Sequence, residues 1–475
     1  MPGVVSLLLR KRLQPVDSVT AAVDEQGAVA RPRLHLSIPR EAFAAMWGAA
    51  APLAVELAAA RLAQALDLLW MGRLGPSALA AVAAGAGLRW VFASLPLGLA
   101  VGGMAAVARH RGRHDAKAAS SAVWQTLLAG ALLATLLSMA GWALAPVLPR
   151  AIGLSDDVAL QAAGYLRIVL PGLAPLALLP VLAALLRAAG GAVAARRALI
   201  LAAGLTMAVE PPLVFGWGPL PALGVAGSAL AAVLGPAAGV LVLLALLGRG
   251  YGCLQLRRTT PAWRPREMGR ILIASAPYSL QLTLRALARA ALLAILARFG
   301  SLALAGYAAA DAVLLLALVP SYALAEAAAA LAMRSRRQGR PAAAGRGVCA
   351  MGTLNLAYMA VAVAGALVLA PQAVALFCPA PRAVALGADM LRIAGLGYLG
   401  SSLGVIAARG LDVTGHVVPV AAVNLITLWG VEVPAALLLS RIQGPAGVWL
   451  ALAFGAAANG ILMSYHFRRG RGLPA

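Results

Sequence analysis

The chain has 475 residues, of which 62% are hydrophobic and only 12% are charged. A soluble domain carries roughly 25% charged residues, so this composition excludes an ordinary soluble enzyme. A formal net charge of +23 would suggest a nucleic-acid binder in a soluble protein, but the positions of the basic residues argue against that class.

Apolar runs recur along the whole chain, and a transmembrane helix needs about 20 apolar residues. They predict about twelve helices, at roughly 41–70, 78–107, 119–146, 158–186, 197–217, 223–247, 269–298, 303–332, 347–371, 384–409, 417–440 and 446–467. The longest polar connection, 248–270, falls between the sixth and seventh helices. We therefore predict an all-α membrane protein with two pseudo-symmetric six-helix lobes. Its expected parts are a basic tail (1–40), an N-lobe (41–247), a linker (248–268), a C-lobe (269–467) and a second tail (468–475).

The basic residues are distributed unevenly about the predicted helices. Of the 39 Lys and Arg residues, 28 lie in the tails or in the connections on one side, and five lie in the connections on the other side. This asymmetry is typical of the positive-inside bias, so we expect both termini in the cytoplasm and the chain in the plasma (inner) membrane. Anionic lipid is the expected partner of this charge, and nucleic acid is not.

The two halves align with each other at a shift of 225 residues. This shift places Pro52 on Pro277, and residues 166–168 (LRI) on residues 391–393 (LRI). Because each half has an even number of helices, both have one orientation, as in transporters whose halves are related by an axis along the membrane normal. Such transporters bind their substrate between the halves and rock one half against the other.

Several motifs together resemble the multidrug and toxin extrusion (MATE) family within the MOP flippase superfamily. They are the segments 65–75 (ALDLLWMGRLG), 187–190 (RAAG), 210–216 (EPPLVFG) and 223–227 (LGVAG). The first resembles the family's first-helix signature, and the others resemble its helix-four turn and its helix five–six region. The resemblance covers residues 41–467. It implies cation-coupled efflux of organic, often cationic compounds through a cavity between two lobes.

Two acidic residues are the candidate coupling groups. A charged side chain in the membrane costs about 2.5–3.5 kcal/mol even on insertion scales, so such residues are functional candidates. Asp67 matches the acidic residue of the family's first helix, and Glu210 matches the family's acidic position before a proline. A carboxylate in a cavity can bind and release a proton as access alternates. Alternatively, Asp67 caps a helix end or pairs with Arg73, and Glu210 hydrogen bonds to helix termini.

Other polar residues of the predicted helices are candidates for the substrate cavity. They are Glu56, Arg61, Gln64, Arg89, Thr206, Arg285, Arg289 and Asp311. Arginine does not lose its charge in a protein, so it needs a carboxylate, a wet cavity or an anionic ligand. Pairing with Glu56, Asp67 or Asp311 is the structural alternative. A cavity for anionic or zwitterionic substrates is the other, as in a flippase of anionic or lipid-linked substrates.

The family's acidic position in helix seven is occupied by Arg285, so the C-lobe departs from the family pattern. We therefore expect coupling to rest on Asp67 in the N-lobe. This favours protons over Na⁺, because Na⁺ needs several oxygen ligands whereas a proton needs one carboxylate.

The remaining motifs indicate a transporter rather than an enzyme. The sequence has no HExxH, no GxSxG and no phosphate-binding loop, and its five His residues lie in predicted tails or connections. We expect small-molecule substrates, no bound metal or organic cofactor, and a monomer. The three cysteines, Cys253, Cys349 and Cys378, lie far apart and are predicted to be core residues.

Overall fold

The computed structural model describes residues 40–219, 221–250, 254, 263–337, 341–413, 417–467 and 469. Within these ranges the regular structure consists of helices joined by turns. The predicted tails and much of the predicted linker lie outside the described residues, so their boundaries stay predictions.

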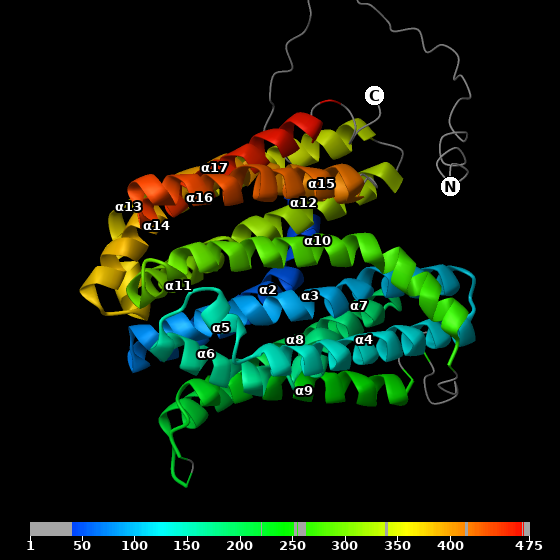
Figure 1. Ribbon diagram of the computed structural model, residues 1–475. Coiled ribbons are helices and arrows are strands. Elements are labelled where there is room, and N and C mark those ends of the chain that lie inside the picture. The colour runs from blue at the N-terminus through cyan, green and yellow to red at the C-terminus, as the bar shows by residue number, and fades with distance from the viewer. Residues whose placement is uncertain are drawn as a thin grey trace, which may run out of the picture. The chain divides into compact units, whose positions relative to one another are not determined.

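The N-lobe contains six helical segments, the fourth of which is built from two helices. In chain order the elements are α2 (Arg40–Leu74), α3 (Pro76–Gly112), α4 (Ala116–Leu144), the short α5 (Leu148–Ala151), α6 (Asp156–Val169) with α7 (Leu173–Ala188), α8 (Ala192–Phe215) and α9 (Val225–Gly248). Figure 1 shows α4, α8 and α9 in one part of the bundle.

The C-lobe repeats this count of six segments. Its elements are α10 (Pro265–Ala297), α11 (Ser301–Ala317) with α12 (Val319–Arg337), α13 (Pro341–Phe377), α14 (Pro381–Val413), α15 (Val417–Leu425) with the π-helix η2 (Ile426–Glu432) and α16 (Val433–Gln443), and α17 (Pro445–His466). In Figure 1, α14, α16 and α17 lie together in the other part of the bundle.

Most of these segments have the length and composition of membrane spans. In the described part of the chain, ten stretches pass this test, and the bent pair α6–α7 makes eleven. With the 35-residue α2, the chain has the twelve predicted segments. The prediction of an all-α membrane protein with two six-helix lobes is confirmed.

Glycines at equivalent turns show the internal repeat in the backbone. Gly75 and Gly300 precede the second helix of their lobes with φ of 125° and 88°. Gly224 and Gly444 precede the sixth helix with φ of 56° and 63°. Glycine adopts these positive φ values without the steric cost that a side chain imposes. The same unusual backbone at the same place in both lobes supports the 225-residue repeat.

Breaks interrupt three of the spans. The helices α6 and α7 meet at an angle of 57° around Pro171, which was predicted as a hinge. A turn at Leu318 separates α11 from α12, just before Pro320. The eleventh span contains the π-helix η2, a form that is frequent at functional sites.

The lobes meet along α3 and α10, at residues with small side chains. Ser94 Oγ lies 2.9 Å from Thr283 Oγ1, Ser279 Oγ donates to the Leu95 carbonyl, and the Gly102 N–H donates to Ser275 Oγ. A side chain at Gly102 would collide with Ser275. Close backbone contact of this kind is how helices associate in lipid.

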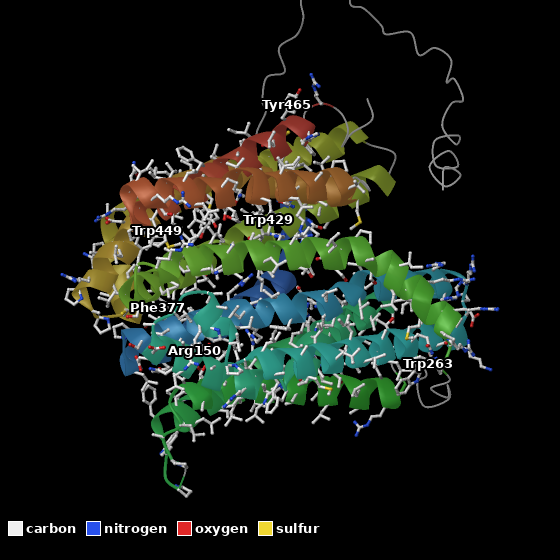
Figure 2. All side chains as sticks on the ribbon, in the orientation of Figure 1. Arg150, Trp263, Phe377, Trp429, Trp449 and Tyr465 are labelled. Carbon is white, nitrogen blue, oxygen red and sulfur yellow. The ribbon has the colours of Figure 1, made fainter. Side chains whose placement is uncertain are left out.

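The two ends of the helices differ in chemistry. We call one the basic end, where α3, α7 and α9 finish and α10 begins, because Arg109, Arg187 and Arg264 lie there. We call the other the far end, where the turns at Gly75, Gly224, Gly300 and Gly444 lie. Figure 2 shows Trp263 near the basic end and Phe377 near the far end.

An apolar cluster closes the lobes against each other in the half of the bundle near the far end. It includes Met71 and Leu79 of the N-lobe with Leu304 and Phe377 of the C-lobe. The Gly72 Cα lies so close to the Phe377 carbonyl that a Cβ there would collide with it. The lobes are therefore in backbone contact at this end.

Two of the cysteines are described by the structure. Cys378 is buried in the far-end cluster, as predicted, but Cys349 is exposed, so that part of the core prediction is wrong. Cys349 lies on a face of α13 that does not pack against another helix at that point. Cys253 lies outside the described residues.

Candidate functional site

A cavity of about 670 Å³ lies between the lobes. Its walls come mainly from the N-lobe helices, and Tyr322, Ala323, Glu326 and Arg409 of the C-lobe complete it. Seven of the predicted site residues line it: Glu56, Arg61, Gln64, Asp67, Arg89, Thr206 and Glu210. Residues from four helices that are distant in sequence thus meet around one space.

Two carboxyl groups form the centre of the N-lobe wall. Asp67 of α2 accepts a hydrogen bond from Ser228 Oγ of α9 at 2.6 Å. Glu210 of α8 is only 1% exposed, and neither of its carboxyl oxygens has a hydrogen-bond partner among the described residues. Asp67 is the charged group that acts most strongly on Glu210. The fully buried Tyr165 lies in the field of both carboxyl groups and of Arg89.

The local sequence explains how these side chains meet. Pro211 and Pro212 lack backbone N–H groups, so they free carbonyls in the preceding turn of α8. The turn at Gly224 then brings the chain back antiparallel, with the Gly224 N–H donating to the Val214 carbonyl. Gly227 packs directly against the Leu213 carbonyl. This close approach sets Ser228, the next residue, opposite Asp67.

Ion pairs lie where the cavity approaches the basic end, one in each lobe. Arg187 Nη2 is 2.8 Å from Glu56 Oε1, and Arg409 Nη2 is 2.6 Å from Glu326 Oε1. The partner of Glu56 is thus an arginine of α7, not Arg61, which was considered as its partner from the sequence. Arg61 and Glu56 are five residues apart on α2, a spacing that does not place two side chains on the same face.

Three further predicted residues line the same cavity with different roles in packing. Arg61 Nη1 donates to Gln64 Oε1 at 2.8 Å, on its own helix. Thr206 donates to the Ala202 carbonyl and packs against Gly235. Arg89 takes part in none of the hydrogen bonds or ion pairs that the described residues form with one another. The alternative that Asp67 pairs with Arg73 is wrong, since the Arg73 guanidinium lies over the Trp70 ring, 5.1 Å from its centroid.

The predicted C-lobe residues lie elsewhere. Arg289 of α10 forms an ion pair with Asp311 of α11 and lies 6.0 Å from the centroid of the Tyr307 ring. Tyr307 in turn stacks on the buried Trp449. Arg285 lies one turn before Arg289, and neither these two arginines nor Asp311 line the cavity described above. They form a separate C-lobe cluster, in which Glu432 at the end of η2 also lies in the field of both arginines.

Several residues of the site were not predicted from the sequence. Ser228 follows the motif 223–227, so the glycine turn was a signal that the next side chain faces α2. Tyr165 precedes the repeated segment 166–168 but has no polar neighbour in sequence. The contribution of Tyr322 from the opposite lobe had no sequence signal that we can identify.

Known proteins match this chain over most of its length. The sequence model of the MatE family matches residues 52–211 and again 277–438, two segments offset by 225 residues at their starts. The chain is 24% identical over 405 residues to the probable multidrug resistance protein YoeA of Bacillus subtilis, covering 84% of this chain and 88% of that protein. It is 31% identical over 182 residues to the probable multidrug resistance protein NorM of Deinococcus radiodurans, covering 38% of this chain and 40% of that protein.

Solved structures match the fold. An inward-facing multidrug resistance MATE transporter of the MOP superfamily superimposes with a TM-score of 0.79 at 20% identity, covering 88% of this chain and 98% of that one. An outward-facing one gives 0.72 at 22% identity, covering 92% and 97%. Both halves of the chain carry the family's sequence pattern, and its helices have the fold of these transporters. The chain belongs to the MatE family.

Proposed function

We propose that the chain is a secondary active efflux transporter that exports organic, often cationic compounds in exchange for protons by alternating access. The observation that carries this proposal is the neighbouring pair of carboxyl groups, Asp67 and Glu210, in the wall of the cavity between the lobes. Relatives named as probable multidrug resistance proteins support the same class of activity.

The coupling step follows from the chemistry of this pair. Two carboxylates close together in a poorly solvated wall repel each other, so a proton or a cation in their place lowers the free energy. A bound organic cation and a proton therefore compete for one site. Proton binding releases the cation, and loss of the proton allows the next cation to bind. Ser228 holds Asp67 in position by its hydrogen bond.

Protons are favoured over Na⁺ as the coupling ion. Na⁺ needs several oxygen ligands in place of its hydration shell, whereas a proton needs one carboxylate. The Thr206 hydroxyl, the other hydroxyl near this wall, is hydrogen bonded to its own helix. Ser228 is then the hydroxyl that bonds to the pair.

The conformation indicates the direction of access. The far end is closed by the contact between Gly72 and Phe377 and by the apolar cluster around it. In the proposed cycle, substrate enters the cavity from the basic end in this conformation, and rocking of the lobes then opens the far end. The ion pairs Glu56–Arg187 and Glu326–Arg409 flank the route of entry.

We place the basic end in the cytoplasm and the chain in the plasma (inner) membrane, because basic connections stay on the cytoplasmic side. A fluorescent protein and alkaline phosphatase, each fused after residue 475, test this orientation. Fluorescence without phosphatase activity is expected, and the reverse result would invert the topology.

A second candidate is a flippase or exporter of anionic or lipid-linked substrates. Arg89 favours it, because this arginine lines the cavity and has no carboxylate partner among the described residues. An anionic group of the substrate would supply the missing partner. The carboxyl pair at Asp67 is the reason for placing this candidate second.

The test uses purified full-length protein in liposomes with an imposed proton or Na⁺ gradient and a fluorescent organic cation. We expect the proton gradient to drive movement of the dye by the wild type. Asp67→Asn removes the titratable group at nearly constant shape, so gradient-driven movement should fall to the level of vesicles without protein. Asp389→Asn, at a side chain 56% exposed on α14, is the matched control and should behave as the wild type.

Each outcome has a distinct meaning. Wild-type export by Asp67→Asn would refute the coupling mechanism. Movement driven by Na⁺ alone would replace the coupling ion but keep the transporter. Movement of no organic cation with either gradient would transfer the proposal to the anionic candidate.

A further inference from the structure

A second cavity, of about 610 Å³, lies at the basic end between the last turn of α3 and the first turns of α10. It is distinct from the cavity at Asp67, with which it shares no residue. Because α3 belongs to the N-lobe and α10 to the C-lobe, both lobes form its walls. We call it the seam pocket. Its lining is strongly basic: Arg109, His110, Arg113, Arg264, Arg266 and Arg270.

Most of this positive charge is not neutralised within the described part of the chain. Glu267 is the one acidic residue in the lining. Its Oε2 already accepts a hydrogen bond from Ser121 at 2.9 Å and lies 3.7 Å from Arg264. The other four arginines appear in none of the hydrogen bonds or ion pairs of the described residues. Two of them, Arg109 and Arg113, come from α3, and two, Arg266 and Arg270, come from α10.

Like charges gathered from both lobes oppose the close contact of the lobes at this point. Yet the contact is tight, since Gly102 in the floor of the pocket donates to Ser275 of α10. The amino-terminal end of α10 adds the partial positive charge of the helix dipole. An anion in the pocket would offset the repulsion and would hydrogen bond to guanidinium groups in their preferred bidentate geometry.

The position of the pocket selects a lipid as the source of that anion. Trp263, directly before α10, is 58% exposed, and aromatic residues of this kind lie at the membrane–water interface. Below the pocket, α10 exposes the apolar side chains Ile273 and Leu280. A lipid could thus place its phosphate among the arginines and its acyl chains along α10. Basic pockets between transmembrane helices bind such headgroups in other membrane proteins.

We propose that the seam pocket binds the phosphate groups of an anionic membrane lipid, and best a lipid with two phosphates, such as diphosphatidylglycerol. Two arginine pairs, one on each lobe, match two phosphate groups. Because the ligand bridges α3 and α10, it stabilises the conformation in which their basic ends are together. It therefore slows any step of a rocking cycle that separates them.

The test measures the thermal unfolding midpoint of the purified full chain in four environments. These are phosphatidylcholine alone, with diphosphatidylglycerol, with phosphatidylglycerol, and with soluble inorganic phosphate. A ligand that binds the folded state raises the midpoint, here by about 3–5 °C. We expect the largest rise with diphosphatidylglycerol, a smaller one with phosphatidylglycerol, and none with inorganic phosphate. An equal rise with inorganic phosphate would overturn the lipid source.

Variants connect the effect to the pocket. Arg109→Gln with Arg266→Gln removes one arginine from each lobe and should abolish most of the lipid-induced rise. Arg197→Gln with Arg249→Gln removes the same charge from exposed positions at the basic end outside the pocket and should retain it. Equal loss in both double variants would show only general surface charge and would refute the site. If the first variant does not fold, the wild-type lipid series alone still decides, because equal midpoints in all lipids would refute binding.

Discussion

The ion pair between Arg289 and Asp311 should be a structural element of the C-lobe, and its removal should destabilise the protein measurably. Breaking a buried ion pair from one side costs about 3–5 kcal/mol, because the remaining charge stays without a partner. The Asp311 side chain is 14% exposed but that of Arg289 is 44% exposed, so water or the cavity relieves part of the cost. The Tyr307 ring also retains some attraction for the guanidinium. We therefore expect about 3 kcal/mol for Asp311→Asn.

The two sides of this pair should differ. After Asp311→Asn the guanidinium of Arg289 stays charged, since arginine does not lose its proton. After Arg289→Gln the carboxyl group of Asp311 can take up a proton and become neutral. The second variant should therefore be less destabilised than the first. The double variant leaves no unpaired charge and should be more stable than Asp311→Asn alone.

The assay is unfolding of the purified protein in mixed micelles with increasing denaturing detergent, for the wild type, both single variants and the double variant. A matched cycle at Asp389 and Arg392 of α14 is the control. These side chains are 56% and 41% exposed and 3.8 Å apart, so their pair should contribute about 0–1 kcal/mol. If Asp311→Asn costs no more than Asp389→Asn, the C-lobe pair is not structural and the argument fails.

Two further predictions concern access and substrate charge. Gly72→Val should prevent closure of the far end, because its Cβ would collide with the Phe377 carbonyl. Buried Cys378 should then react faster with a membrane-impermeant maleimide in a chain whose other cysteines are replaced, and an unchanged rate would contradict the closure. Arg89→Gln should reduce transport of a zwitterionic probe about tenfold, for loss of roughly 1.4 kcal/mol of interaction, and leave its methyl ester unaffected. An equal effect on both compounds would show that Arg89 acts on the fold and not on a carboxylate.

Much of the fold could be predicted because it depends on local composition. Apolar runs determine the spans, and Gly75, Gly224, Gly300 and Gly444 repeat at equivalent turns because only glycine suits their backbone. The breaks were less predictable. Pro171 marks the bend of the fourth segment, but the π-helix 426–432 has no comparable signal in sequence.

The site was predicted residue by residue but not in its contacts. Asp67 and Glu210 were recognised as intramembrane acids, yet the partner of Asp67 is Ser228, which lies 161 positions away in sequence. The partner of Glu56 is likewise 131 positions away. Such contacts depend on how α2 packs against α7, α8 and α9. Helical spacing within one segment carries no information about that packing.

The repeat makes the lobes alike in backbone but not in charge, and this difference limits which lobe can couple an ion to transport. In the N-lobe, Asp67 and Glu210 lie together, and no arginine forms an ion pair with either among the described residues. In the C-lobe, Asp311 is already paired with Arg289, whose charge is permanent. A site that holds a fixed internal cation has little need for a proton or a metal ion. Under the proposed mechanism the N-lobe therefore responds to protons, while the C-lobe moves as its passive counterpart. If so, gradient-driven transport should disappear with Asp67 alone, even though the chain carries two copies of the same six-helix fold.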